Sequence, residues 1–212
     1  IRGKETITYF NNSPDTLRNP VIKLFLNIHK PGAPRNGGVS ADYLNSGVHI
    51  DAVTADGKKV NWPNNPFAFT AQQFRLPASL PPHGSVQLTF DWHYEISLES
   101  NREGMIDSTT YFLAYFYPRV AVYDDYNGWD RMPFMDDHEF YSDFNDYDVT
   151  INVPKNYIVC GTGTLQNPGS LLQPAILQRY NQSSTSDATI QIATSDDVMN
   201  KRVTTQNAMN SW

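Results

Sequence analysis

The sequence predicts an all-β protein built from mostly antiparallel, sandwich-like sheets. Many short stretches alternate apolar and polar residues, which is the period of a strand with one buried face. Turn residues, above all Gly, Pro, Asn and Asp, separate these stretches. One stretch, residues 174–182, places apolar side chains at helical spacing after a proline, so we expect at most one short helix, near 174–182.

The first half of the chain supplies the clearest strand patterns. Residues 1–10 alternate and predict a half-buried strand, and residues 21–28 and 48–53 continue the strand pattern. Asp56-Gly57 lies between apolar residues and predicts a hairpin turn. Residues 85–96 predict a long strand whose alternate positions are apolar.

The most unusual stretch is residues 111–130, which combines an aromatic run, a proline and an acidic turn. Its first part, 111–117, is so dense in aromatic side chains that we expect a strand buried on both faces or covered by a second domain. Pro118 should end its ladder pairing. After a short strand, residues 124–128 predict a turn in which Gly128 adopts a positive φ.

The last third of the chain predicts short strands on both sides of the helix. Residues 149–153 alternate before a proline. Residues 157–164 form a further candidate strand, with Cys160 as a small buried apolar residue rather than a nucleophile. Residues 189–194 and 201–207 are candidates for closing strands.

Composition limits the classes of partner. The chain has 212 residues, with 22 acids against 16 Lys and Arg, and its net charge of -6 argues against nucleic acid and anionic membranes. Because no apolar run approaches the roughly 20 residues that a membrane-spanning helix needs, we expect no transmembrane segment. A single cysteine excludes an internal disulfide and does not fix the compartment.

The spacing of histidines predicts no metal site. The five histidines include no pair at the spacing that places two imidazoles on one helix or strand face, so we expect no metal in this chain. His138-Glu139 begins like a zinc-peptidase motif, but Ser142 stands where the second histidine belongs. We therefore expect the chain alone to have no catalytic residues and no cofactor.

Acidic residues concentrate between positions 124 and 148. Nine of the 22 acids lie there: Asp124, Asp125, Asp130, Asp136, Asp137, Glu139, Asp143, Asp146 and Asp148. A calcium loop of the EF-hand type does not fit, because Tyr123 and Phe134 stand at positions that need carboxylates. A solvated acidic loop is the alternative, and binding of another cation is left open.

Several ordered motifs carry a family resemblance. They are residues 11–17 (NNSPDTL), 102–104 (REG), 117–124 (YPRVAVYD), 127–129 (NGW), 139–144 (EFYSDF) and 147–154 (YDVTINVP). In this order they resemble the amino-terminal domain of bacterial M1-family zinc metallopeptidases, the aminopeptidase N-like gluzincins. The resemblance extends over nearly the whole chain.

The resemblance implies that residues 1–212 form a single, saddle-shaped amino-terminal β domain of a larger exported peptidase, periplasmic or on the bacterial surface. Its partner would be the catalytic domain of the same polypeptide, which holds zinc and binds the peptide substrate. The family's H-E-x-x-H and G-x-M-E-N motifs do not occur here, so the catalytic domain lies outside this chain. Many members carry a glutamine that reaches the substrate, whereas this chain has Ala114-Tyr115-Phe116 in that region.

The same resemblance places a group of residues at the substrate cleft or at the interface with the catalytic domain: Tyr115, Phe116, Tyr117, Pro118, Arg119, Asp124, Asp125 and Trp129. The three neighbouring aromatic residues should leave an exposed apolar patch in this chain. The acidic turn, residues 123–130, would favour basic peptides at the cleft. In the alternative interpretation, its aspartates only cap turns.

A different class of function stays open. The alternative is an independent β-sandwich that binds carbohydrate or protein at a bacterial surface. An exposed platform of Trp62, Trp92 and Trp129 would favour this alternative, because sugar-binding modules present aromatic faces. Tryptophans that lie in the core or in an interface would not.

Overall fold

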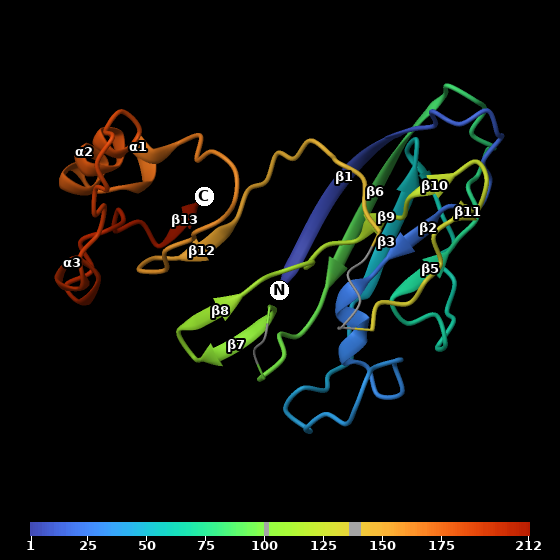
Figure 1. Cartoon of the computed structure of the whole chain (residues 1–212), viewed down its shortest axis with the longest axis horizontal. Helices are drawn as coiled ribbons and strands as arrows, with labels where there is room; N and C mark the ends of the chain where they lie inside the picture. Colours follow the sequence, from blue (N-terminus) through green and yellow to red (C-terminus); the bar gives the residue numbers. More distant parts are fainter. Residues whose placement is uncertain (100–101, 136–140) are drawn as a thin grey trace. The chain divides into compact units, whose positions relative to one another are not determined.

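A computed structural model describes residues 1–99, 102–135 and 141–212. The chain separates into two compact units, Ile1–Phe144 and Asn145–Trp212 (Figure 1). Each unit has its own buried apolar cluster. Every strand pair in the described residues is antiparallel, which confirms the predicted all-β class. The prediction of one domain over residues 1–212 concerns the larger protein and stays a prediction.

The larger sheet of the first unit has the strand order β1-β6-β3-β4 (Figure 1). Its strands are β1 (Arg2–Phe10), β3 (His49–Ala55), β4 (Lys58–Lys59) and β6 (Ser85–His93). The alternation predicted for 85–96 is confirmed, since every second residue of β6 is buried: Val86, Leu88, Phe90 and Trp92. These residues form one face of the core, and the intervening positions face outward.

Two irregularities shape this sheet. Asp56 and Gly57 have φ values of 47° and 73°, so the turn between β3 and β4 has the left-handed geometry that Asp-Gly predicts. In β3 the register shifts between Ile50 and Ala52, so Asp51 is an additional residue in a β-bulge. A bulge of this kind redirects the side chain that it inserts.

A second sheet, in the order β5-β2-β9, packs against the larger one. Its strands are β2 (Val21–Lys23), β5 (Ala71–Gln73) and β9 (Arg119–Val120). Both sheets contribute to the main core of the unit, as Ile22 of β2 and Phe90 of β6 belong to the same buried cluster. This two-layer arrangement is the sandwich-like packing that the sequence predicts.

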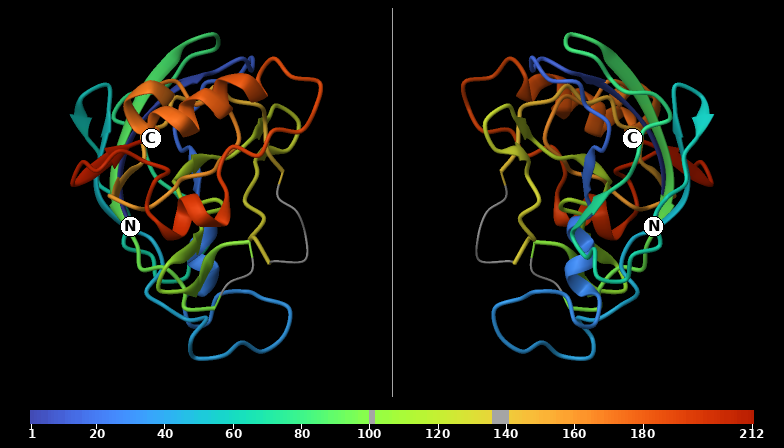
Figure 2. Two further views of the ribbon diagram at one scale, coloured as in Figure 1. Left: turned by 90° about the vertical axis from the view of Figure 1, so that its left-hand side faces the viewer. Right: turned by 90° about the vertical axis from the view of Figure 1, so that its right-hand side faces the viewer.

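The strand predicted over 21–28 is too long. It ends at Lys23, and a buried 3-10 helix, Phe25–His29, follows. Since a short apolar run buried on all sides has no distinctive period, the pattern did not separate strand from helix. The connection that follows, residues 30–47, extends beyond the strands in both views of Figure 2.

The aromatic stretch is not the buried strand that its composition predicts. Two hairpins flank it: β7 (Gly104–Asp107) with β8 (Thr110–Phe112), and β10 (Tyr123–Asp124) with β11 (Gly128–Trp129). β8 ends at Phe112 and is exposed along its length. Residues 113–118 form no ladder, and Tyr115 adopts a φ of 58°. The prediction for 124–128 is confirmed, because Gly128 has a φ of 76°.

The second unit combines a two-stranded antiparallel sheet, formed by the first and last of its elements, with three helices. Its elements are β12 (Asn152–Pro154), α1 (Pro168–Leu171), α2 (Pro174–Ser183), α3 (Ser195–Met199) and β13 (Met209–Ser211). α2 confirms the helix predicted at 174–182. α1 and α3, of four and five residues, exceed the one helix expected.

Three strand predictions in this unit are wrong. Residues 157–164 and 189–194 form no strand, and residues 201–207 contribute one isolated bridge, between Leu172 and Thr204. Cys160, predicted to be buried, is exposed.

α3 begins at a capping box. The side chains of Thr194 and Asp197 each accept a hydrogen bond from the backbone N–H of the other residue.

Candidate functional site

Tyr115, the first of the predicted cleft residues, is held in a left-handed backbone conformation by ring packing. Its ring lies 5.7 Å from that of Phe25 and 5.9 Å from that of Phe134, both in edge contacts. Arg102 donates a hydrogen bond from Nη1 to the Tyr115 hydroxyl at 3.0 Å. A positive φ raises the conformational energy of a bulky residue. The ring contacts and the hydrogen bond of Tyr115 offset this cost and hold the turn in place.

Phe116 and Tyr117 pack toward the main core. The ring of Phe116 lies 6.3 Å from that of Trp92 and 5.2 Å from that of Tyr117. Tyr115, Phe116 and Tyr117 are each half-buried, so none is fully enclosed by the described chain. Their role as an interface with another domain stays a prediction.

Pro118 immediately precedes the second sheet, which Arg119 enters as the first residue of β9. Pro118 is fully buried, and β9 begins at Arg119, opposite Lys23 of β2. Arg119 donates a hydrogen bond from Nη2 to the carbonyl of Asp143 at 3.0 Å. This hydrogen bond joins the aromatic segment to the last residues of the first unit.

Asp124 caps the turn that it begins. It accepts hydrogen bonds from the backbone N–H of Tyr126 at 2.7 Å and from Asn127 Nδ2 at 3.0 Å. These bonds, that from Tyr126 first, lower the pKa of Asp124. Asp125 is exposed beside it. The Asp124 contacts are those of an Asx turn, as the capping interpretation expects.

Trp129 is half-buried at the end of the same hairpin. Its ring lies 5.0 Å from that of Tyr123 and 5.7 Å from that of Tyr9. Tyr123 donates its hydroxyl hydrogen to Asp15 at 2.7 Å, and this bond raises the pKa of Tyr123. The hairpin is therefore packed against β1 rather than projecting freely.

Asp130 forms a buried ion pair that the sequence did not reveal. Its carboxylate lies 2.8 Å from Nζ of Lys23, and the two side chains are 12% and 3% exposed. Lys23 also donates a hydrogen bond to the carbonyl of Met132 at 2.8 Å. The pair ties β2 to the segment after β11. Two of the three aspartates in the turn thus have bonding roles within the chain.

A second buried polar pair joins His29 to Glu103. Nε2 of His29 lies 2.5 Å from a Glu103 oxygen, and Nδ1 donates to the carbonyl of Tyr43 at 2.9 Å. The other Glu103 oxygen and the Tyr94 hydroxyl have no hydrogen-bond partner in the described residues. Burial first, and then the charge of Glu103, raises the pKa of Tyr94. Sequence reasoning missed this pair, since its members are far apart in the chain.

Glu5 lies on the core-facing side of β1, opposite Phe90. Burial raises the pKa of its carboxyl to about 8, and one of its oxygens has no hydrogen-bond partner among the described residues. Next to it, Gly3 leaves room for the Trp92 indole, which lies against the β1 backbone. A protonated carboxyl is the form that such a setting favours.

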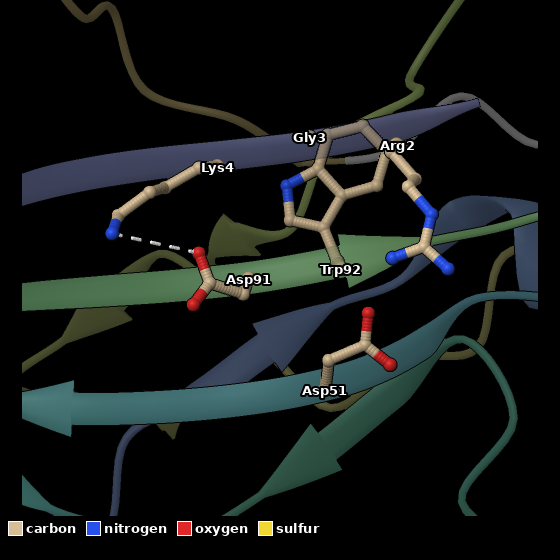
Figure 3. Close-up of a pocket in the computed structure, with 6 residues that line it drawn as sticks. All are labelled: Arg2, Gly3, Lys4, Asp51, Asp91 and Trp92. Atoms are coloured by element: carbon tan, nitrogen blue, oxygen red, sulfur yellow. Dashed lines mark ion pairs between the residues drawn. The ribbon is translucent and has the colours of Figure 1, made fainter.

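A hollow at the start of β1 has charged walls. It is lined by Arg2, Gly3, Lys4, Asp51, Asp91 and Trp92 (Figure 3). Lys4 forms an ion pair with Asp91 at 3.8 Å, while the guanidinium of Arg2 turns toward Asp51 (Figure 3). The hollow is open to solvent, so these charges act in a strongly screened setting.

The spacing argument considered histidine pairs within one helix or strand, whereas two histidines meet here across neighbouring strands. His49 and His93 lie opposite each other on β3 and β6, and their rings stack with centroids 4.8 Å apart. Among the described residues, no group of three or more His, Cys, Asp or Glu side chains is arranged to hold a metal ion. His138, Asp136, Asp137 and Glu139 lie outside the described residues.

No family model, curated protein or solved structure matches this chain significantly. In the part of the chain that the structure describes, no helix has the length and apolar character needed to cross a membrane.

Proposed function

We propose that this chain is the non-catalytic amino-terminal domain of an M1-type zinc metallo-aminopeptidase, which packs on the catalytic domain and flanks the substrate cleft. The observation that supports this most is the setting of the segment from Tyr115 to Trp129. Its aromatic rings are anchored to the core on one side by Phe25, Trp92 and Tyr9. They remain half-exposed on the other.

Aromatic side chains that are half-exposed and held rigidly by the core are well suited to an interface with another domain. Each such ring buries on the order of 150–250 Å² when fully covered, so covering them with a second domain would stabilise the assembled protein. The neighbouring hairpin β7–β8 adds exposed apolar side chains, Ile106 and Phe112. Zinc would be held by the catalytic domain, and the peptide would bind in the cleft between the domains.

The binding-module alternative lacks its expected feature. Trp92 is buried, and Trp62 packs on Phe74 and Phe90 of the core. Trp129 packs on Tyr9 and Tyr123. All these tryptophans lie in the described residues, and none is exposed as a flat platform. No specific observation therefore favours carbohydrate binding.

The most direct test begins with the reading frame beyond Trp212. We expect an H-E-x-x-H motif and a downstream glutamate in the following domain; their absence would rule out the proposal. The full-length protein should then hydrolyse aminoacyl anilides, and chain 1–212 alone should not.

Hydrogen exchange supplies the structural part of the test. Backbone amides of residues 111–130 should exchange more slowly in the full-length protein than in chain 1–212. Amides of β6 serve as the control, since they are paired on both sides in either form. Equal exchange of 111–130 in the two proteins would show that this segment contacts no second domain.

A further inference from the structure

The outward face of the larger sheet carries a pair of histidines with a specific geometry. His49 and His93 are direct partners across β3 and β6. Their rings are 4.8 Å apart between centroids and inclined by 11°. Both residues are accessible to solvent, unlike the buried His29.

Each histidine has one ring nitrogen fixed by a protein oxygen. Nδ1 of His93 lies 2.8 Å from the Asp51 carboxylate, which as an ion can only accept, so Nδ1 donates. Nε2 of His49 lies 2.8 Å from the hydroxyl of Ser46. Nε2 of His93 therefore keeps its lone pair, which points away from Asp51. In the tautomer in which Nε2 of His49 donates to Ser46, Nδ1 of His49 likewise keeps its lone pair.

A histidine that binds a metal through one ring nitrogen commonly donates a hydrogen bond from its other ring nitrogen to a carboxylate. This hydrogen bond fixes the tautomer and makes the other nitrogen a better ligand. Here the hydrogen bond depends on the bulge in β3, because Asp51 is the residue that the bulge inserts. A regular strand would not place an additional side chain at this position of the outward face.

The distance between the two ring centroids matches that expected for two imidazoles bound to one metal ion. With metal–nitrogen bonds of about 2.0–2.1 Å, two imidazoles on one ion have centroids roughly 4.5–5 Å apart. The stacked planes must tilt for their nitrogens to converge. His49 is exposed, and exposed side chains change rotamer readily, so His49 supplies this movement.

The charges around the pair come from three strands. Arg2 of β1 is the register partner of His93, and Lys4 lies two positions further along the same strand. Lys4 is paired with Asp91, and Arg2 turns toward Asp51 (Figure 3). The two aspartates thus offset the two cations beside the histidines.

We propose that His49 and His93 form a two-histidine binding site for a divalent transition-metal ion, with Asp51 as the residue that orients His93 and water completing the coordination. Imidazole ligands suit Cu²⁺, Ni²⁺ and Zn²⁺, and the usual order of affinity places Cu²⁺ first. This proposal is independent of the peptidase proposal, and it differs from the expectation that the chain binds no metal.

Calorimetric titration of chain 1–212 with CuCl₂, NiCl₂ and ZnCl₂ tests the site. The chain should carry no affinity tag and a Cys160→Ser substitution, because the exposed Cys160 thiol is a competing ligand. We expect saturable one-to-one binding, tightest for Cu²⁺. His49→Gln and His93→Gln should each weaken binding at least tenfold, and Asp51→Asn about 10–100-fold.

Two substitutions elsewhere serve as matched controls. His83→Asn removes an exposed imidazole from a turn with a φ of 58°, which asparagine tolerates. His138→Asn removes one of the other histidines of the sequence. Both should leave the affinity unchanged. Absence of saturable binding would overturn the proposal, and so would an affinity that survives His49→Gln and His93→Gln. Electron paramagnetic resonance of the Cu²⁺ form should show coupling to two nitrogens in the parent chain and loss of that pattern in either variant.

Discussion

The buried ion pair between Lys23 and Asp130 allows a sharp test of the packing described above. Asp130→Asn preserves the shape of the side chain and removes its charge. The Lys23 ammonium, 3% exposed, would then keep the carbonyl of Met132 as an acceptor but lose its counter-charge. Removing one partner of a buried pair costs about 3–5 kcal/mol. Because Lys23 keeps its hydrogen bond to the carbonyl of Met132, we expect the free energy of unfolding to fall by about 3 kcal/mol, the lower end of this range.

Urea unfolding followed by tryptophan fluorescence measures this loss. With a slope of about 1–3 kcal/mol per molar urea, the midpoint should fall by roughly 1–3 M. Asp125→Asn is the matched control, because it makes the same charge change on an exposed side chain of the same turn. Surface changes of this kind stay within about 0.5 kcal/mol.

The double variant Lys23→Met with Asp130→Asn separates a charge effect from a packing effect. It removes the uncompensated ammonium, so it should be less destabilised than the sum of the two single variants. Strict additivity, or an Asp130→Asn loss no larger than that of Asp125→Asn, would refute the reasoning.

Two further predictions concern β1. Because burial raises the Glu5 pKa from 4.5 to about 8, the folded state holds this proton more tightly than the unfolded state, and stability should fall as pH rises between these values. Glu5→Gln should remove that fall in urea unfolding between pH 5 and pH 8.5; an unchanged pH profile would contradict it. Gly3→Ala places a Cβ 2.2 Å from the Trp92 ring, so it should displace the indole, change near-ultraviolet circular dichroism and cost about 1–3 kcal/mol. An unaltered spectrum would show that Trp92 does not lie against Gly3.

Local patterns accounted for much of the fold. The alternation in β1 and β6 and the Asp-Gly turn are properties of neighbouring residues, so the sequence contains them. The aromatic run at 111–117 misled the prediction because density of aromatic side chains carries no period. Its rings pack in two directions from a turn at Tyr115. The helix α3 was predictable, since Thr194-Ser195-Asp196-Asp197 matches a capping box.

The side-chain pairs were beyond sequence reasoning. Lys23 with Asp130, His29 with Glu103, and His49 with His93 each join residues far apart in the chain. The meeting of His49 with His93 depends on strand register and on the bulge at Asp51. The other two pairs include residues outside the strands, so their meeting depends on how the connecting segments pack. One sequence without its relatives reveals neither. The predicted cleft residues were located by motif order, and their contacts with Phe25, Phe134 and Tyr9 became visible only in the structure.

The division into two units determines what common spectroscopic probes report. Trp62, Trp92 and Trp129 lie in the first unit, so indole fluorescence follows mainly that unit, with Trp212 as the contribution of the second. The α-helices α1, α2 and α3 all lie in the second unit, so helical ellipticity follows that one. If each unit unfolds independently, fluorescence and ellipticity will give different unfolding midpoints. Such a difference would not indicate a folding intermediate within either unit. A Trp212→Phe variant would turn fluorescence into a probe of the first unit alone.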